Sequence, residues 1–136
     1  MKSVSDIQEL LVKAGAESIA LQFSESDISG LSFMLRVDGR EVWFELPAKY
    51  EAVSNLLPST WGWERRQDQA KRTAWRHVLL WVKAQVVMIR TNQVETVQVF
   101  LPYALTPGPD GPRPLFDVFR EGMLCLPSAG EEKSDA

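Results

Sequence analysis

Few side chains in this 136-residue chain are of the types that carry out catalysis. It has one histidine, His77, one cysteine, Cys125, and no glycine-rich phosphate loop. A structural zinc site needs four cysteine or histidine ligands, so these two residues are too few. Three carboxylates that could hold magnesium cluster around one hairpin: Asp38, Glu41 and Glu45. No lysine follows them in the arrangement that nucleases use, so we expect no enzyme, no metal site and no cofactor, and a carboxylate-metal enzyme is the least favoured alternative.

The most informative pattern is a row of cations on one predicted helix. Residues 64–91 contain no helix breaker, and at about 1.5 Å per residue this helix would be about 40 Å long. At about 100° per residue, five basic side chains fall within about 40° of one another: Arg65, Arg72, Arg76, Lys83 and Arg90. We call these five residues the basic stripe. The opposite side carries apolar residues that can dock the helix on a sheet: Ala70, Ala74, Trp75, Val78, Trp81, Val82, Met88 and Ile89.

A row of exposed cations is typical of a surface that contacts phosphates. Arg66, Lys71 and His77 flank the stripe, and Trp61 and Trp63 supply aromatic rings on which bases could stack. Two other interpretations stay open. The stripe could be a solvated helix face, or it could contact a protein, including a second copy in a homodimer, because aliphatic residues border it. These bordering residues are Leu79, Leu80, Val86 and Val87.

The composition indicates a single globular domain. Hydrophobic residues make up 45% and charged residues 24% of the chain, as in an average globular protein, and this length suits one core. The net charge is −3, yet residues 56–95 carry three acids against seven bases, so the middle third is basic. No secretory signal and no run of 18 apolar residues are present, so we predict a cytoplasmic protein without membrane association.

The elements that must position the stripe follow from hydrophobic periodicity. A capping box predicts a helix over residues 6–14, and Gly15 follows where a left-handed cap is needed. Alternating apolar residues predict three antiparallel strands, at 18–23, 31–37 and 42–47, of which the last two form the hairpin 31–47. We expect a loop over residues 24–30 and a type I′ turn at Asp38-Gly39.

Shorter helices flank these elements. We expect them at residues 50–57, 94–104 and 114–121. The buried side of the last one is expected to consist of Leu115, Phe116 and Phe119. Residues 127–136 are polar and charged and are expected to form a disordered tail. The sequence therefore predicts an α+β fold in a single domain, residues 1–126, with a three-stranded antiparallel sheet covered by a long amphipathic helix.

The order helix, three antiparallel strands, helix with basic residues at its start resembles that of the double-stranded-RNA-binding domain. Residues 69–74, Gln-Ala-Lys-Arg-Thr-Ala, resemble the lysine-alanine motif that opens the second helix of that domain. In this chain residues 48–63 intervene between the third strand and the helix, whereas that family enters its helix almost directly. Because of this departure, the family's phosphate-binding roles are not carried over to these residues.

Other segments resemble a family of small uncharacterised bacteriophage and prophage proteins, over roughly residues 5–120. Members share a strand pair ending in Leu-Pro, a Trp-Arg helix leading to a Lys-Ala step, and a Phe-Leu segment followed by a turn and a short helix. The matching segments here are residues 37–47, 74–76, 83–84 and 99–105. The family offers no established activity to carry over. The resemblance implies a mobile element in the cytoplasm of a bacterial host, where such proteins serve replication and recombination or block host defence.

Our leading hypothesis from the sequence is a non-enzymatic, phage-type accessory protein. It would bind nucleic acid, or a host or phage nucleoprotein complex, through the basic stripe, and one form of this role is an anti-CRISPR-like inhibitor of a host defence nuclease. Arg66 and the stripe would supply charge, while Trp61 and Trp63 would supply stacking or an aromatic anchor. The alternative is a self-associating scaffold or adaptor protein without nucleic-acid contact.

Overall fold

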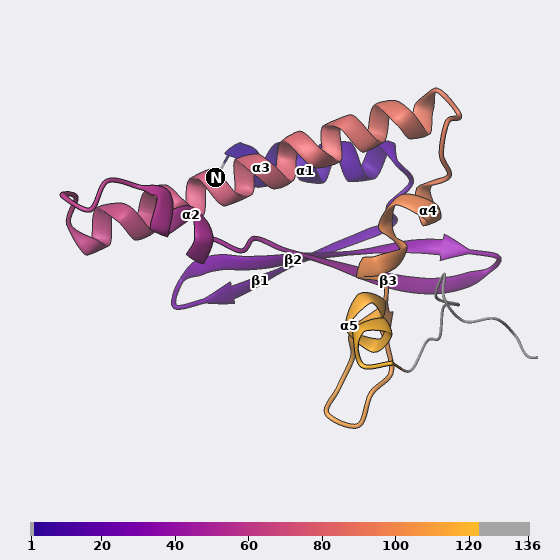
Figure 1. Ribbon diagram of the computed structural model, residues 1–136. Coiled ribbons are helices and arrows are strands. Elements are labelled where there is room, and N and C mark those ends of the chain that lie inside the picture. Colours follow the sequence, from indigo (N-terminus) through magenta and orange to yellow (C-terminus); the bar gives the residue numbers. More distant parts are fainter. Residues whose placement is uncertain (1, 123–136) are drawn as a thin grey trace, which may run out of the picture.

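Two helices lie side by side on one face of a three-stranded antiparallel sheet (Figure 1). The computed structural model describes residues 2–122, so Cys125 and the predicted tail lie outside the described residues. The helices are α1 (Lys2–Lys13) and α3 (Trp63–Arg90), and the strands, in the order β1-β2-β3, are β1 (Ser18–Ser24), β2 (Asp27–Val37) and β3 (Arg40–Pro47). The predicted α+β fold, with a long helix packed on a three-stranded antiparallel sheet, is confirmed.

Short elements surround this two-layer body. They are α2 (Glu51–Leu56), α4 (Thr96–Phe100), the 3-10 helix η1 (Leu101–Tyr103), β4 (Leu105–Thr106), β5 (Arg113–Pro114) and α5 (Leu115–Arg120). Strands β4 and β5 pair with each other in a separate two-stranded sheet. After α3, the chain runs through α4 and η1 past the strand β3. Helix α5 therefore lies away from the layer formed by α1 and α3 (Figure 1).

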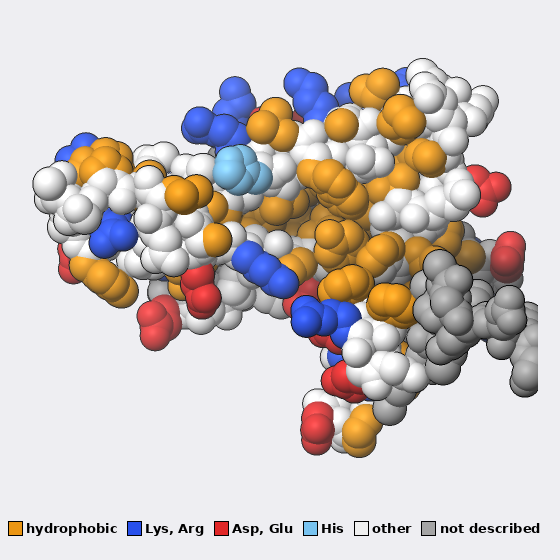
Figure 2. All heavy atoms as spheres, in the orientation of Figure 1, with side chains coloured by type: hydrophobic (Ala, Val, Ile, Leu, Met, Phe, Trp, Pro, Cys, Tyr) orange, Lys and Arg blue, Asp and Glu red, His pale blue; other side chains and the backbone are white. Residues whose placement is uncertain are grey.

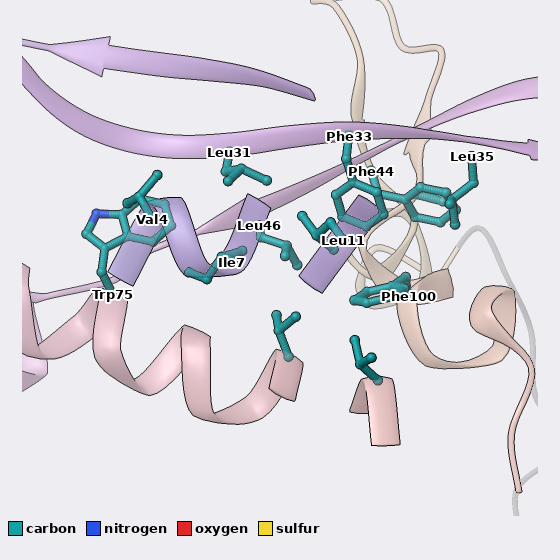
Figure 3. Close-up of a cluster of buried hydrophobic side chains, with 13 residues drawn as sticks. Val4, Ile7, Leu11, Leu31, Phe33, Leu35, Phe44, Leu46, Trp75 and Phe100 are labelled. Atoms are coloured by element: carbon teal, nitrogen blue, oxygen red, sulfur yellow. The ribbon is translucent and has the colours of Figure 1, made fainter. Parts of the chain in front are cut away.

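The core between the helices and the sheet is built around aromatic rings (Figure 3). Phe33 of β2 stacks on Phe44 of β3 at 5.2 Å between ring centroids, and Phe100 meets Phe33 edge-on at 5.0 Å. From α3, Trp75 is fully buried, and its indole Nε1 donates a hydrogen bond to the backbone carbonyl of Ile28 at 3.2 Å. A buried tryptophan N–H usually finds a hydrogen-bond partner, and here this bond ties α3 to the sheet.

Helix α1 closes the core from beside α3. Val4, Ile7 and Leu11 are buried at the i, i+3, i+7 spacing of one helix face. The predicted Gly15 cap is confirmed, since Gly15 has φ +105° and the amide of Ala16 donates to the carbonyl of Leu11 at 2.9 Å. The predicted start at residue 6 is wrong because α1 begins at Lys2, where an extra turn buries Val4.

The two turns of the sheet share a left-handed backbone, but the sequence predicted only one of them. Asp38 and Gly39 have φ +50° and +81°, which confirms the predicted tight turn between β2 and β3. The loop predicted at residues 24–30 is wrong, since β2 begins at Asp27 and only a two-residue turn separates it from β1. In this turn Glu25 and Ser26 have φ +50° and +72°, a conformation that neither residue type favours, so no sequence signal marked it.

The expected buried side of α5 is also wrong in two of its three members. Phe116 is 48% exposed and Phe119 is 39% exposed, whereas Leu115 packs against the core. The first residue of α5 is tied to the body of the domain, since its amide donates to the carbonyl of Ala104 at 2.8 Å. The rest of the helix extends beyond the edge of the sheet (Figure 1).

The strained turn predicts a stabilising substitution. Ser26→Gly should raise the free energy of unfolding by about 1 kcal/mol, because glycine adopts a positive φ without the cost paid by other residues. Gly39→Ala should lower the free energy of unfolding by about 1 kcal/mol, because alanine at a positive φ is strained. The added Cβ would meet nothing within 4 Å, so the backbone strain alone accounts for this loss. Equilibrium urea denaturation measures both. A loss of stability in Ser26→Gly would contradict the left-handed turn.

Candidate functional site

The basic stripe lies exposed along the outer side of α3. All five of its residues are exposed, and none of them forms an ion pair with another described residue. From Arg65 to Arg90 the row extends about 37 Å at about 1.5 Å per residue. Figure 2 shows Lys and Arg side chains along the upper edge of the molecule, with hydrophobic side chains between them. Within the described part of the chain, the stripe is therefore a linear array of cations without an ion-pair partner.

The stripe lies on a helix with few acids. Residues 69–90 contain no aspartate or glutamate, and the acids of the helix, Glu64 and Asp68, stand near its N-terminus, where the helix dipole favours them. The cations that do form ion pairs among the described residues belong to other sites: Arg36, Lys71 and Arg113. Among residues 2–122, therefore, no acid forms an ion pair with the stripe.

Trp61 shares the side of the molecule on which the stripe begins. The guanidinium carbon of Arg65 lies 3.8 Å from the centroid of the Trp61 ring, in a cation–π contact. Trp63 is 72% exposed, but at about 100° per residue it leaves the helix about 160° around from Arg65. Of the two predicted stacking residues, the structure thus brings Trp61 to the stripe and turns Trp63 to the other side of α3.

Arg66, predicted as a binding residue, is half-buried and serves the packing of α2. Its Nη2 donates to the backbone carbonyl of Ser54 at 3.0 Å, and Gln67 Nε2 donates to the Ser54 hydroxyl at 3.0 Å. Ser54 itself is buried in α2. These bonds attach the segment inserted after β3 to the start of α3, which leaves Arg66 little freedom to reach a ligand.

Lys71 is likewise engaged within the fold. Its Nζ donates to Asp27 Oδ2 at 2.6 Å and lies 5.4 Å from the Tyr50 ring centroid. The hydrogen bond to Asp27 raises the pKa of Lys71 above its ordinary value, so the amine keeps its charge and its partner. This residue links the start of β2 to α3 and contributes little to the charge presented along the stripe.

Two of the four aliphatic residues expected to border the stripe do so. Leu80 is 59% exposed and Val87 is 57% exposed, next to the cations on the outer surface. The prediction is wrong for Val86, which is buried because it follows Val82 by four residues on the core side of the helix. Leu79 is half-buried and packs against the core. An aliphatic line therefore runs along one side of the stripe only.

Carboxylates, one histidine and two hollows are the other candidates for chemistry among residues 2–122. No group of three or more His, Cys, Asp or Glu side chains there is placed to hold a metal ion, and Glu41 lies 3.4 Å from Arg36 in an ion pair. His77 is exposed at the rim of a hydrophobic hollow formed with Val78 and Trp81. A groove of about 480 Å³ beside α5 is lined by Pro47, Lys49, Pro102, Tyr103, Pro114, Phe116 and Asp117. It offers neither a thiol nor a histidine, so the surface of α3 is the better candidate for function.

Comparisons of the chain with known proteins found no related protein. No protein-family model matches the chain, and no match was found among curated proteins or among solved structures. Over the described residues, no helix is long and apolar enough to cross a membrane. The function is therefore inferred from the side chains and their geometry.

The two arginine environments predict different effects on stability. Arg66→Ala should lower the free energy of unfolding by about 1 to 2 kcal/mol, because it leaves the carbonyl of buried Ser54 without this donor. Arg76→Ala, the matched control on the exposed stripe, should change it by less than about 0.5 kcal/mol. Equilibrium denaturation compares the two variants. Equal effects would contradict the structural role of Arg66.

Proposed function

We propose that this protein is a non-enzymatic accessory protein that binds nucleic acid by contacting phosphates along the basic stripe. The observation that carries the proposal is the array itself: five exposed cations in a row of about 37 Å, four of them in residues 69–90, which contain no acid. A solvated helix face usually mixes both signs of charge, and ion pairs between residues three or four apart stabilise it. Arg76, Lys83 and Arg90 have no acid three or four residues away on the helix, which favours a ligand that supplies the anions.

The expected strength of binding follows from counterion release. Five phosphate contacts give a slope of about −4.5 for the logarithm of the association constant against the logarithm of salt concentration on duplex DNA. Affinity should then fall about 500-fold between 50 and 200 mM salt. Because the contacts are to phosphates, we expect little dependence on base sequence. Trp61, held under Arg65 at the start of the stripe, would add stacking on an unpaired base or a frayed end.

The resemblance to the double-stranded-RNA-binding domain supports nucleic acid as a ligand class through the order of elements alone. Lys71, in the segment that resembles the lysine-alanine motif, is already paired with Asp27. Glu25, in the β1–β2 turn, lines the same hollow as Asp27 and Lys71 and adds negative charge there. Phosphates would be repelled there, so the proposed contact surface is the outer side of α3 rather than the surface on which that family would be expected to bind.

In a cell, such a protein would act by occupancy. A straight basic ridge on a small domain covers a length of nucleic acid and blocks whatever enzyme must reach it. We extend the proposal accordingly to the mobile-element context that the sequence resemblance implies, where the target is a host or phage nucleoprotein complex and one outcome is inhibition of a defence nuclease. This role needs no chemistry from the protein itself.

Charge reversal tests the proposal. Arg65→Glu combined with Arg72→Glu should weaken binding by about 100-fold or more and should reduce the salt slope by about 1.8, because two phosphate contacts are lost. The matched control is Arg40→Glu combined with Lys49→Glu, which changes the net charge equally at exposed cations outside α3. Fluorescence anisotropy with labelled single-stranded DNA, duplex DNA and duplex RNA, each at two salt concentrations, measures the effect. Absence of binding to all three, or equal loss in both double variants, would refute the stripe as the site.

A further inference from the structure

The outer surface of α3 carries a second pattern next to the cations. Five residues follow one another at alternating intervals of four and three: Thr73, His77, Leu80, Ala84 and Val87. We call these five residues the seam. This is the spacing of the a and d positions at which one helix packs against another in a coiled coil. The last four are exposed, and no described element covers them.

The cations beside the seam occupy a defined place in the same repeat. Arg76, Lys83 and Arg90 recur every seven residues, and Arg76 and Lys83 stand directly before His77 and Ala84 of the seam. With the seam at a and d, these three cations are at the g positions, whose charges select the partner helix. The surface therefore has both parts of a helix-pairing face: an apolar line and a flanking row of a single charge.

We propose that the seam binds an amphipathic helix of a partner protein with acidic residues along its flanks. Leu80 and Val87, at 59% and 57% exposed, are apolar surface that this helix would remove from water. Its carboxylates would pair with Arg76, Lys83 and Arg90, which have no ion-pair partner among the described residues. This inference goes beyond the proposed function and does not depend on it, because aliphatic side chains contribute nothing to phosphate binding.

A second copy of the chain fits the seam poorly. In an antiparallel pair the g positions of the two helices face each other, which would bring cation against cation. In a parallel pair g faces e, and the e positions here are Ala74, Trp81 and Met88. Because residues 69–90 contain no acid, neither orientation neutralises Arg76, Lys83 or Arg90 through α3 of the second copy. The charge pattern thus selects a helix of opposite charge.

The contact would be modest in strength and exclusive with nucleic acid. The seam spans about 21 Å at about 1.5 Å per residue, a length that gives an interface on the small side of stable complexes. A dissociation constant on the order of 10 µM is expected for such a contact. Since the partner helix and a phosphate backbone would use the same three cations, each should displace the other from the C-terminal half of the stripe.

The test uses two synthetic helical peptides of four heptads with leucine at a and d. One has glutamate at every e and g position and the other has lysine there, so like charges keep each peptide from pairing with itself. The full-length protein should bind the glutamate peptide at least 10-fold more tightly than the lysine peptide in an anisotropy titration. Leu80→Ser combined with Val87→Ser should weaken the glutamate peptide at least 10-fold, while circular dichroism shows an unchanged fold.

The same double variant separates this inference from the proposed function. Its binding to DNA and RNA should equal that of the wild type, because neither substituted residue is charged. Equal binding of the two peptides would overturn the inference, and so would loss of nucleic-acid binding in the double variant, which would assign the seam to the nucleic-acid site. A wild-type dimer in sedimentation that the two substitutions dissociate would also overturn it, in favour of a second copy as the occupant.

Discussion

The structure depends on the burial of one side of α3 against the sheet and α1. Trp75 anchors this side through its ring and its indole N–H, and Val82 and Val86 continue the contact toward the C-terminal end. Contact at successive turns keeps a helix of 28 residues against one support. The outer side therefore becomes a fixed, nearly straight surface. A mobile helix could carry the same charges. Only a helix that is packed along its length holds these charges at fixed positions relative to a ligand with a regular repeat.

Much of this fold could be predicted because its determinants are local. The long helix has an unbroken sequence with one apolar side, and Asp38-Gly39 suits the type I′ turn, one of the two that a two-residue hairpin favours. The turn at Glu25-Ser26 has the same backbone but could not be predicted, because it is imposed by the pairing of β1 with β2 rather than by its own residues. Periodicity likewise placed Phe116 in the core, since a helical pattern does not say whether a helix ends over the sheet or beyond it.

The features of the candidate site also fall into two groups: those that the sequence predicts and those that arise only from tertiary contacts. The exposure of the stripe follows from helix geometry alone, so Arg72 and Lys83 were placed correctly from the sequence. The engagement of Arg66 with Ser54 and of Lys71 with Asp27 could not be foreseen, because the partners are 12 and 44 residues away and meet only after folding. Counting basic residues therefore overstates the charge available to a ligand, whereas their partners in the fold decide which of them are free.

The absence of acids from residues 69–90 has a consequence for the folding equilibrium. Like charges four residues apart, such as Arg72 and Arg76, repel each other and weaken a helix. In the folded state the helix keeps these charges close together, whereas in the unfolded chain they can move apart. Mobile ions screen such charges, and an anion bound to the folded state alone shifts the equilibrium toward it. A higher ionic strength should therefore have two opposite effects on this domain. It should stabilise the free protein, and it should weaken the binding of a ligand that carries phosphates.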